Sequence, residues 1–257
     1  MTPTRRVILL GASNLTRSFP TVVATVRQTW SEPIEFMVAM GHGRSYWQHS
    51  AVLGRKIPGI FPCALWRDLQ TREKLPTTAL VTDIGNDFLY GATPERLLEG
   101  VECCLDRLAD VDAATIVTQL PSASIEALGE RRFQLLRRLL FPRSTIKLAE
   151  AKSYVREMNS RLAELPNARK ISAIPVSAAW YGFDPIHIRR RSEREAWPAL
   201  LSGWRTDHKP LALQRSSLLM IAYLASLAPL EWSQFGISRR AAQPCGRFHD
   251  GTTISLY

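Results

Sequence analysis

The sequence alternates short apolar runs with longer amphipathic stretches, and this alternation limits the possible folds more than any other feature. The apolar runs that we expect to be strands are Val7–Leu10, Ile34–Met40, Ala79–Thr82, Ala114–Thr118 and Lys170–Ile174. Apolar runs separated by helical stretches are typical of parallel strands, because each parallel connection needs a crossover that is usually a helix. The chain is therefore predicted to be an α/β protein with a central parallel five-stranded sheet covered by helices.

Helical periodicity fills the intervals between these runs. The stretch after the third run has the clearest start, because Thr93 can cap a helix and Pro94 suits its first turn. Apolar residues then repeat at helical spacing as far as Leu108. The other helices that we expect are Thr16–Trp30, Ser124–Phe141, Ile146–Leu165 and a helical stretch within Leu213–Leu230.

The length and composition indicate one folded domain. A chain of 257 residues fits a single α/β domain and can bury a full core. With 46% hydrophobic and 22% charged residues, the chain does not have the composition of a disordered protein. We expect one domain over residues 1–257, with a core over about 5–204 and a C-terminal extension over 205–257 whose role the sequence does not indicate.

The chain carries a net charge of +10, which is compatible with a polyanionic partner. No nucleic-acid-binding motif accompanies this charge, so a nucleic-acid partner is not expected. Part of the charge is a basic cluster, Arg189, Arg190, Arg191 and Arg194. A solvated helix face and a contact with an anionic substrate both remain open for this cluster.

Four cysteines match no zinc-binding spacing and no disulfide framework, which favours a reducing, cytoplasmic location without a metal. The N-terminal residues lack the pattern of a secretory signal. The longest uncharged stretch, Ser216–Leu230, is shorter than the roughly 20 residues that a membrane-spanning helix needs. A membrane partner is therefore not expected.

Residues with chemical potential follow the predicted strands directly. Gly11-Ala12-Ser13 follows the first strand, Gly41-His42-Gly43 the second, and Gly85-Asn86-Asp87 comes shortly after the third. The segment Asp184-Pro185-Ile186-His187 lies in the loop after the fifth. Because ligand sites of open parallel sheets lie beyond the carboxyl ends of the strands, we expect these four segments to meet at one edge of the sheet.

These residue types suit nucleophilic catalysis by serine. The Ser13 hydroxyl needs a base to take its proton, and His187 can be that base. Asp184 can orient the imidazole and stabilise its charged form. The backbone N–H groups of Ser13 and Gly43, with the side-chain amide of Asn86, can form an oxyanion hole. This chemistry needs no cofactor and no metal.

The same four segments resemble the sequence blocks of the SGNH (GDSL-like) hydrolases, in the order of that family. Gly11-Ala12-Ser13-Asn14-Leu15 is similar to the Gly-Asp-Ser-Leu block, Gly85-Asn86-Asp87 to the Gly-x-Asn-Asp block, and Asp184-Pro185-Ile186-His187 to the Asp-x-x-His block. The resemblance implies a flavodoxin-like three-layer α/β/α sandwich. It also implies hydrolysis of carboxylic esters or thioesters of small molecules, without a metal.

The chain departs from the family pattern at two points. The first block lacks the usual Asp before the serine, and the second block leaves open whether Gly41 or Gly43 supplies an oxyanion N–H, of which we expect Gly43. The degenerate first block also leaves open a catalytically inactive binding protein of the same fold. A dinucleotide-dependent oxidoreductase is disfavoured, because Ser13 and Thr16 stand where a dinucleotide fingerprint needs glycines.

Overall fold

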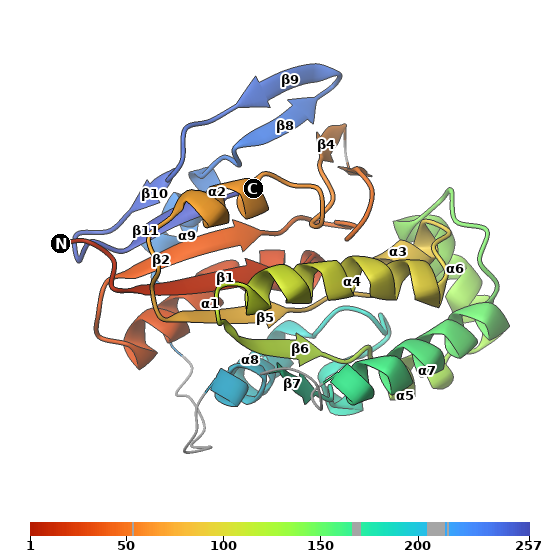
Figure 1. The fold of residues 1–257 in the computed structure, drawn as a ribbon. Coiled ribbons are helices and arrows are strands. Elements are labelled where there is room, and N and C mark those ends of the chain that lie inside the picture. The colour runs from red at the N-terminus through yellow and green to blue at the C-terminus, as the bar shows by residue number, and fades with distance from the viewer. Residues whose placement is uncertain (53, 166–170, 205–213, 215) are drawn as a thin grey trace.

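The structure, a computed structural model, describes residues 1–52, 54–165, 171–204, 214 and 216–257. Its main sheet has seven strands in the order β10-β11-β2-β1-β5-β6-β7 (Figure 1). Their bounds are Arg5–Leu10 for β1, Ile34–Ala39 for β2, Thr77–Val81 for β5, Ala114–Thr118 for β6, Ile171–Ile174 for β7, Gly246–Arg247 for β10 and Thr253–Leu256 for β11. Lys170, at the start of the expected fifth strand, lies outside the described residues.

The expected α/β class and parallel sheet are confirmed. The five strands expected from apolar runs are β2, β1, β5, β6 and β7 in spatial order, and each pairs in parallel with its neighbour. This is the flavodoxin-like order, in which the second strand along the chain lies beside the first and outside it. The carboxyl ends of β1, β2 and β5 therefore lie side by side.

The sheet is larger than expected by two strands, and both come from the C-terminal region. Strand β11 pairs in parallel with β2, with Ile254 opposite Phe36, and β10 pairs antiparallel with β11. These strands satisfy backbone groups that would otherwise leave β2 as an open edge. The extension over 205–257 thus contributes to the main sheet.

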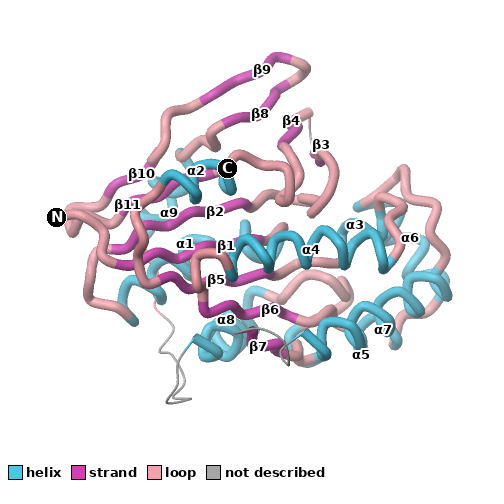
Figure 2. The backbone as a smooth tube through the Cα atoms, in the orientation of Figure 1, coloured by secondary structure: helices cyan, strands magenta, loops and turns pink. Residues whose placement is uncertain are grey.

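Helices cover both faces of the sheet, as Figures 1 and 2 show. One buried cluster packs helices α2, α4, α5, α6 and α7 against one face, and a second packs α1, α8 and α9 against the other. Their bounds are Ser13–Thr29 for α1, Leu65–Thr71 for α2, Asn86–Leu89 for α3, Pro94–Ala109 for α4, Ser122–Glu126 for α5, Glu130–Leu140 for α6, Leu148–Glu164 for α7, Glu193–Leu201 for α8 and Leu218–Ser226 for α9. Short 3₁₀ helices lie at Ala178–Trp180, Arg190–Ser192 and Ser202–Trp204.

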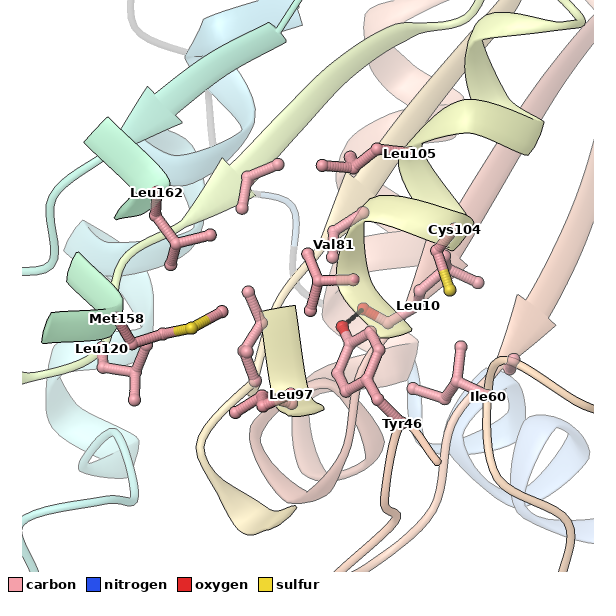
Figure 3. Close-up of a cluster of buried hydrophobic side chains, with 14 of the residues drawn as sticks. Leu10, Tyr46, Ile60, Val81, Leu97, Cys104, Leu105, Leu120, Met158 and Leu162 are labelled. Carbon is pink, nitrogen blue, oxygen red and sulfur yellow. Dashed lines mark hydrogen bonds between the residues drawn. The ribbon is translucent and has the colours of Figure 1, made fainter. Parts of the chain in front are cut away.

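Helix α4 shows how the sequence pattern becomes core. The Thr93 hydroxyl accepts a hydrogen bond from the N–H of Arg96 and caps the helix, as expected. Leu97 and Leu105 of this helix belong to the same buried cluster as Leu10 and Val81 of strands β1 and β5 (Figure 3). Packing of this apolar stripe positions the strand ends from which the site is built.

Two expected helices are shorter than the pattern indicated. The stretch Ser124–Phe141 contains two helices, α5 and α6, because the backbone is extended at Gly129, with φ −88° and ψ 157°. In the described part of the stretch Leu213–Leu230, the helix is α9, which ends at Ser226 because the backbone becomes extended at Leu227. Leu213 itself lies outside the described residues.

A second, antiparallel sheet has the strand order β3-β4-β8-β9, and the apolar pattern did not indicate it. The strands are Ser50–Val52, Arg55–Ile57, Glu231–Gln234 and Ile237–Arg240. None of the described helices combines the length and hydropathy needed to cross a bilayer. The described His, Cys, Asp and Glu residues form no group of three or more that could hold a metal ion.

Candidate active site

Ser13 is the first residue of helix α1, which follows strand β1 after a short turn. The carboxylate of Asp83 lies at this helix N-terminus. Its Oδ2 accepts hydrogen bonds from the N–H groups of Ala12, Asn14 and Leu15 at 2.9, 3.0 and 3.1 Å. A carboxylate here satisfies helix N–H groups that have no partner within the helix, and its negative charge interacts favourably with the positive end of the helix dipole. These hydrogen bonds explain why helix α1 begins at Ser13, three residues before Thr16, where the sequence pattern predicted its start.

Asn14 connects the turn of Ser13 to the loop that contains His187. Its Nδ2 donates to Asp83 Oδ1 at 2.7 Å and to the carbonyl oxygen of Ile186 at 2.9 Å. Its Oδ1 accepts from the N–H of Ile188 at 2.8 Å. The side chain of Asn14 thus fixes the backbone on both sides of His187 relative to Ser13.

The structure brings Ser13, His187 and Asp184 together in one hydrogen-bonded chain. His187 Nε2 lies 2.8 Å from Ser13 Oγ, and His187 Nδ1 lies 2.5 Å from Asp184 Oδ2. The other carboxylate oxygen, Asp184 Oδ1, accepts from the N–H groups of Ile186 and His187 at 3.0 and 3.3 Å. The imidazole is therefore held at both nitrogens, with one facing a hydroxyl and the other a carboxylate.

The surroundings of Asp184 keep its carboxyl group ionised. Burial acts to raise the pKa of Asp184, but the hydrogen bond and charge of His187 and two backbone N–H groups lower it further. The net result is a pKa below the ordinary value of an aspartate. A carboxylate that stays charged beside Nδ1 favours the tautomer that leaves Nε2 free to accept a proton from Ser13.

A cleft of about 670 Å³ contains Ser13, His187, Gly43 and Asn86 among its lining residues. The N–H groups of Ser13 and Gly43 donate to no acceptor in the described part of the chain. The side-chain amide of Asn86 makes only a long hydrogen bond, 3.3 Å, to the carbonyl oxygen of Arg44. Three N–H donors with weak or no hydrogen bonds among the described residues therefore lie around one cleft, where they could donate to a developing negative charge.

The two glycines of the second loop lie in different places. Gly43 has φ +61°, a conformation that favours glycine, and it lines the cleft of Ser13. The hydroxyl of Tyr90 donates to the carbonyl oxygen of Gly43 at 2.6 Å and holds this turn. Gly41 lines a separate cavity, and a Cβ there would lie 2.4 Å from the Ile57 side chain. Packing therefore accounts for Gly41.

Asp87 fixes the loop that follows Gly43. Its carboxylate accepts from Ser45 Oγ at 2.5 Å and from the N–H groups of Tyr46 and Trp47 at 2.9 and 3.2 Å. Its side chain is buried, and burial raises the pKa of Asp87 although these hydrogen bonds act in the opposite direction. Asp87 thus positions the loop that follows Gly43 at the cleft.

Sequence reasoning assigned no role to Asn14, Asp83 or Asp87. Their positions were the available signal, because Asp83 lies two residues after the end of strand β5 and Asp87 adjoins Asn86. Asp83 also adopts φ +58°, which is uncommon for a residue other than glycine. Polar groups at a sheet edge can position the loops of a site as well as react.

Other polar residues singled out in the sequence lie near the site or outside it. His42 and His49 line the cleft, but the hydrogen bond of Ser13 Oγ is to His187. Burial, followed by the positive charges of His187 and Arg17, lowers the pKa of His42. In the basic cluster, Arg190, Arg191 and Arg194 are exposed, as expected for a solvated face.

Comparison with solved structures gives neighbours that are distant in sequence. No family model and no curated protein matches the chain. The esterase EstA from Pseudoalteromonas sp., in a form inhibited by monoethylphosphonate, is similar at 14% identity and a TM-score of 0.47, over 77% of this chain and 97% of that one. A mutant of the esterase AlinE4 is similar at 14% identity and a TM-score of 0.42, over 88% and 93% of the two chains.

Proposed function

We propose that this protein is a serine hydrolase of the SGNH type that cleaves carboxylic esters or thioesters of small molecules. The observation that carries the proposal is the continuous chain Ser13 Oγ–His187–Asp184, with contacts of 2.8 and 2.5 Å. Such a chain activates a serine hydroxyl, because the imidazole accepts its proton and the carboxylate stabilises the resulting imidazolium. The proposed roles are nucleophile for Ser13, general base and acid for His187, and orienting carboxylate for Asp184.

The reaction then has two halves. Ser13 Oγ attacks the acyl carbon while His187 Nε2 takes the hydroxyl proton. The bond to the leaving oxygen or sulfur breaks, and His187 returns the proton to that atom, which leaves an acyl ester on Ser13. In the second half, His187 takes a proton from water, the hydroxide attacks the acyl carbon, and Ser13 regains its proton as the carboxylic acid departs.

The oxyanion of each tetrahedral intermediate is proposed to lie among the N–H groups of Ser13 and Gly43 and the amide of Asn86. Fixed donors stabilise developing charge without having to reorganise during the reaction. The N-terminus of α1 adds a favourable potential for negative charge close to Ser13. Asp83 occupies the neighbouring N–H groups, so the Ser13 N–H is the donor of this turn that remains for substrate.

The test of the proposed function is covalent labelling together with ester hydrolysis. A fluorophosphonate probe should label the wild type and the variant Ser31→Ala, whose serine is exposed and lies outside the cleft. It should not label Ser13→Ala. Wild-type protein should hydrolyse p-nitrophenyl esters, and Ser13→Ala should lose at least about 10,000-fold in kcat.

An inert Ser13 would overturn the proposal. A wild type that neither reacts with the probe nor hydrolyses any ester or thioester of the series would instead be a binding protein that keeps the fold without the chemistry. Labelling that persists in Ser13→Ala would move the nucleophile to another residue.

A further inference from the structure

Two cavities of different character meet at Ser13. The first is the cleft of about 670 Å³ already described, which His187, Gly43 and His42 help to line. The second has a volume of about 130 Å³ and extends from Ser13 toward helices α5, α6 and α7. Ser13 and Asn86 line both cavities, so a group bound covalently to Ser13 can reach into either one.

The second cavity, which we call the apolar cavity, is lined mainly by hydrocarbon. Its apolar lining includes Phe88, Leu120, Ile125, Leu128, Phe133 and Leu136. The first five of these side chains are buried in one core cluster, and Leu136 packs against it.

Several polar groups of the lining are engaged within the protein. Asp83 accepts hydrogen bonds from the start of α1, and Thr118 donates to Thr82 Oγ1 at 2.9 Å. The guanidinium of Arg137 donates from one terminal nitrogen to Gln134 at 3.0 Å, whereas its buried Nε has no hydrogen-bond partner among the described residues. The aliphatic stem of Arg137 can contact an apolar ligand. A ligand that fits this cavity is therefore mainly aliphatic.

The position of His187 decides which part of an ester enters which cavity. In acyl transfer, the histidine gives its proton to the leaving group, so the leaving group must lie beside the imidazole. His187 lines the open cleft and is absent from the lining of the apolar cavity. The leaving group therefore occupies the cleft, and the acyl chain points toward α5, α6 and α7.

We infer that the substrate carries an aliphatic acyl chain of medium length, which binds in the apolar cavity. The inference rests on the proposed function of Ser13. A cavity of about 150 Å³ lined by aliphatic and aromatic side chains can hold benzene, so one of about 130 Å³ holds about four to six carbons. Counting the carbonyl carbon and its neighbour outside the cavity, the preferred acyl group has about six to eight carbons.

The test is a series of p-nitrophenyl esters from acetyl to palmitoyl. Burial of each added methylene should raise kcat/KM about fourfold until the cavity is full. The value should then fall for longer chains, because the packed side chains of the cavity wall cannot accommodate extra carbons without strain. The expected optimum is at hexanoyl to octanoyl.

Variants of the cavity wall should move this optimum. Ala151 of α7 lines the apolar cavity, and Ala149 of the same helix is exposed. Ala151→Leu should lower kcat/KM for the octanoyl ester by about tenfold or more and leave the acetyl ester within about twofold. Ala149→Leu should leave the whole series unchanged.

A second pair of variants tests the opposite change and does not depend on the folding of the first. Leu136 of α6 lines the apolar cavity, whereas Leu135 is 57% exposed. Leu136→Ala should move the optimum to longer acyl chains, and Leu135→Ala should not. Circular dichroism and thermal unfolding would verify that each variant is folded.

The failure of this inference can be told apart from the failure of the proposed function. Ester hydrolysis that depends on Ser13 but shows a maximum at acetyl, with no effect of Ala151→Leu or Leu136→Ala, would overturn the inference and leave the hydrolase standing. If the protein hydrolyses no ester, calorimetric binding of octanoate and of acetate to Ser13→Ala would test the inference about the apolar cavity. Octanoate binding that Ala151→Leu weakens would support the apolar cavity, and equal binding of both acids would overturn it.

Discussion

Two carboxylates in different environments, one in the loop after β5 and one in the helix α3 that follows it, hold the two halves of the proposed active site. These are a nucleophile half around Ser13 and an oxyanion half around Gly43 and Asn86. Asp83 supports the nucleophile half, where it accepts from Ala12, Asn14 and Leu15. Asp87 supports the oxyanion half, where it accepts from Ser45, Tyr46 and Trp47. Asp83 is partly exposed, whereas Asp87 is 1% exposed and burial raises its pKa.

This difference shows how one strand end organises a site made from distant segments. The segment after β5 contacts the turn of Ser13 through Asp83 and the loop that follows Gly43 through Asp87. On the nucleophile side the carboxylate meets a helix N-terminus, where charge is favourable. On the oxyanion side, the carboxylate of Asp87 accepts hydrogen bonds from buried N–H and O–H groups, and leaving such groups without an acceptor lowers the free energy of unfolding.

The largest expected effect breaks the nucleophile half. Asp184→Asn should lower kcat by about 10,000-fold, because the imidazole loses the carboxylate that selects its tautomer and stabilises its charge. The fold should stay intact, which circular dichroism can verify, and the exposed Asp110→Asn should keep wild-type kcat. Full activity of Asp184→Asn on an ester that Ser13→Ala cannot cleave would direct the search for the base to His42.

The next effect breaks the oxyanion half. Asn86→Ala should lower kcat by about 100- to 1,000-fold with little change in KM, because one donor to the transition state is lost. Gln48→Ala, at an exposed residue that lines the same cleft, is the matched control. A change in KM alone would identify Asn86 as a substrate-positioning residue and contradict the oxyanion assignment.

A stability measurement compares the two supporting carboxylates directly. Asp87→Ala should lower the free energy of unfolding by about 3 kcal/mol, because it leaves the buried Ser45 hydroxyl and Tyr46 N–H without an acceptor. Asp83→Ala should cost about 1 to 2 kcal/mol, the usual loss of a helix cap. Urea unfolding of both variants beside Asp110→Ala would measure the difference, and the reverse order would refute the comparison.

The smallest effect is a pH dependence of opposite sign in the two halves. The pKa of Asp87 is raised on folding, so its contribution to stability is greatest at low pH and falls as pH rises through the raised value. The pKa of Asp184 is lowered, so its contribution is present above about pH 4 and is lost as pH falls below it. The measurement is the free energy of unfolding of wild type minus that of each variant, Asp87→Asn and Asp184→Asn, between about pH 3 and 7, roughly the range of carboxyl titration. As pH rises, this difference should decrease for Asp87→Asn and increase for Asp184→Asn.

The strands of the parallel core were predictable, and the small second sheet was not. Strands β1, β2, β5 and β6 are nearly continuous apolar runs because both of their faces are covered by helices. Strand β9, by contrast, is exposed throughout and has no apolar pattern. Its pairing with β8 depends on a turn through Phe235 and Gly236, which have positive φ values, and this arrangement leaves little trace in hydropathy.

The contribution of the C-terminal region was also not predictable. Strand β11 has only four residues, Thr253–Leu256, and alternates polar with apolar side chains, although all four are buried beside β2. The main-chain oxygen of Tyr257 then accepts a hydrogen bond from the buried guanidinium of Arg44. Contacts between segments so distant along the chain depend on the assembled sheet, and a local pattern does not report them.

The sequence by itself determined the fold class and the order of the chemical groups along the sheet edge. Hydrophobic periodicity is local, and right-handed parallel crossovers bring consecutive strand ends to one edge, so Ser13, Asn86 and His187 could be placed near each other in advance. Only the tertiary structure decided the 2.8 Å contact of Ser13 with His187, the positioning roles of Asp83 and Asp87, and the apolar cavity beneath α6. Hydrogen-bond geometry and cavity shape depend on how side chains from distant segments pack, and they exist only once those segments have met.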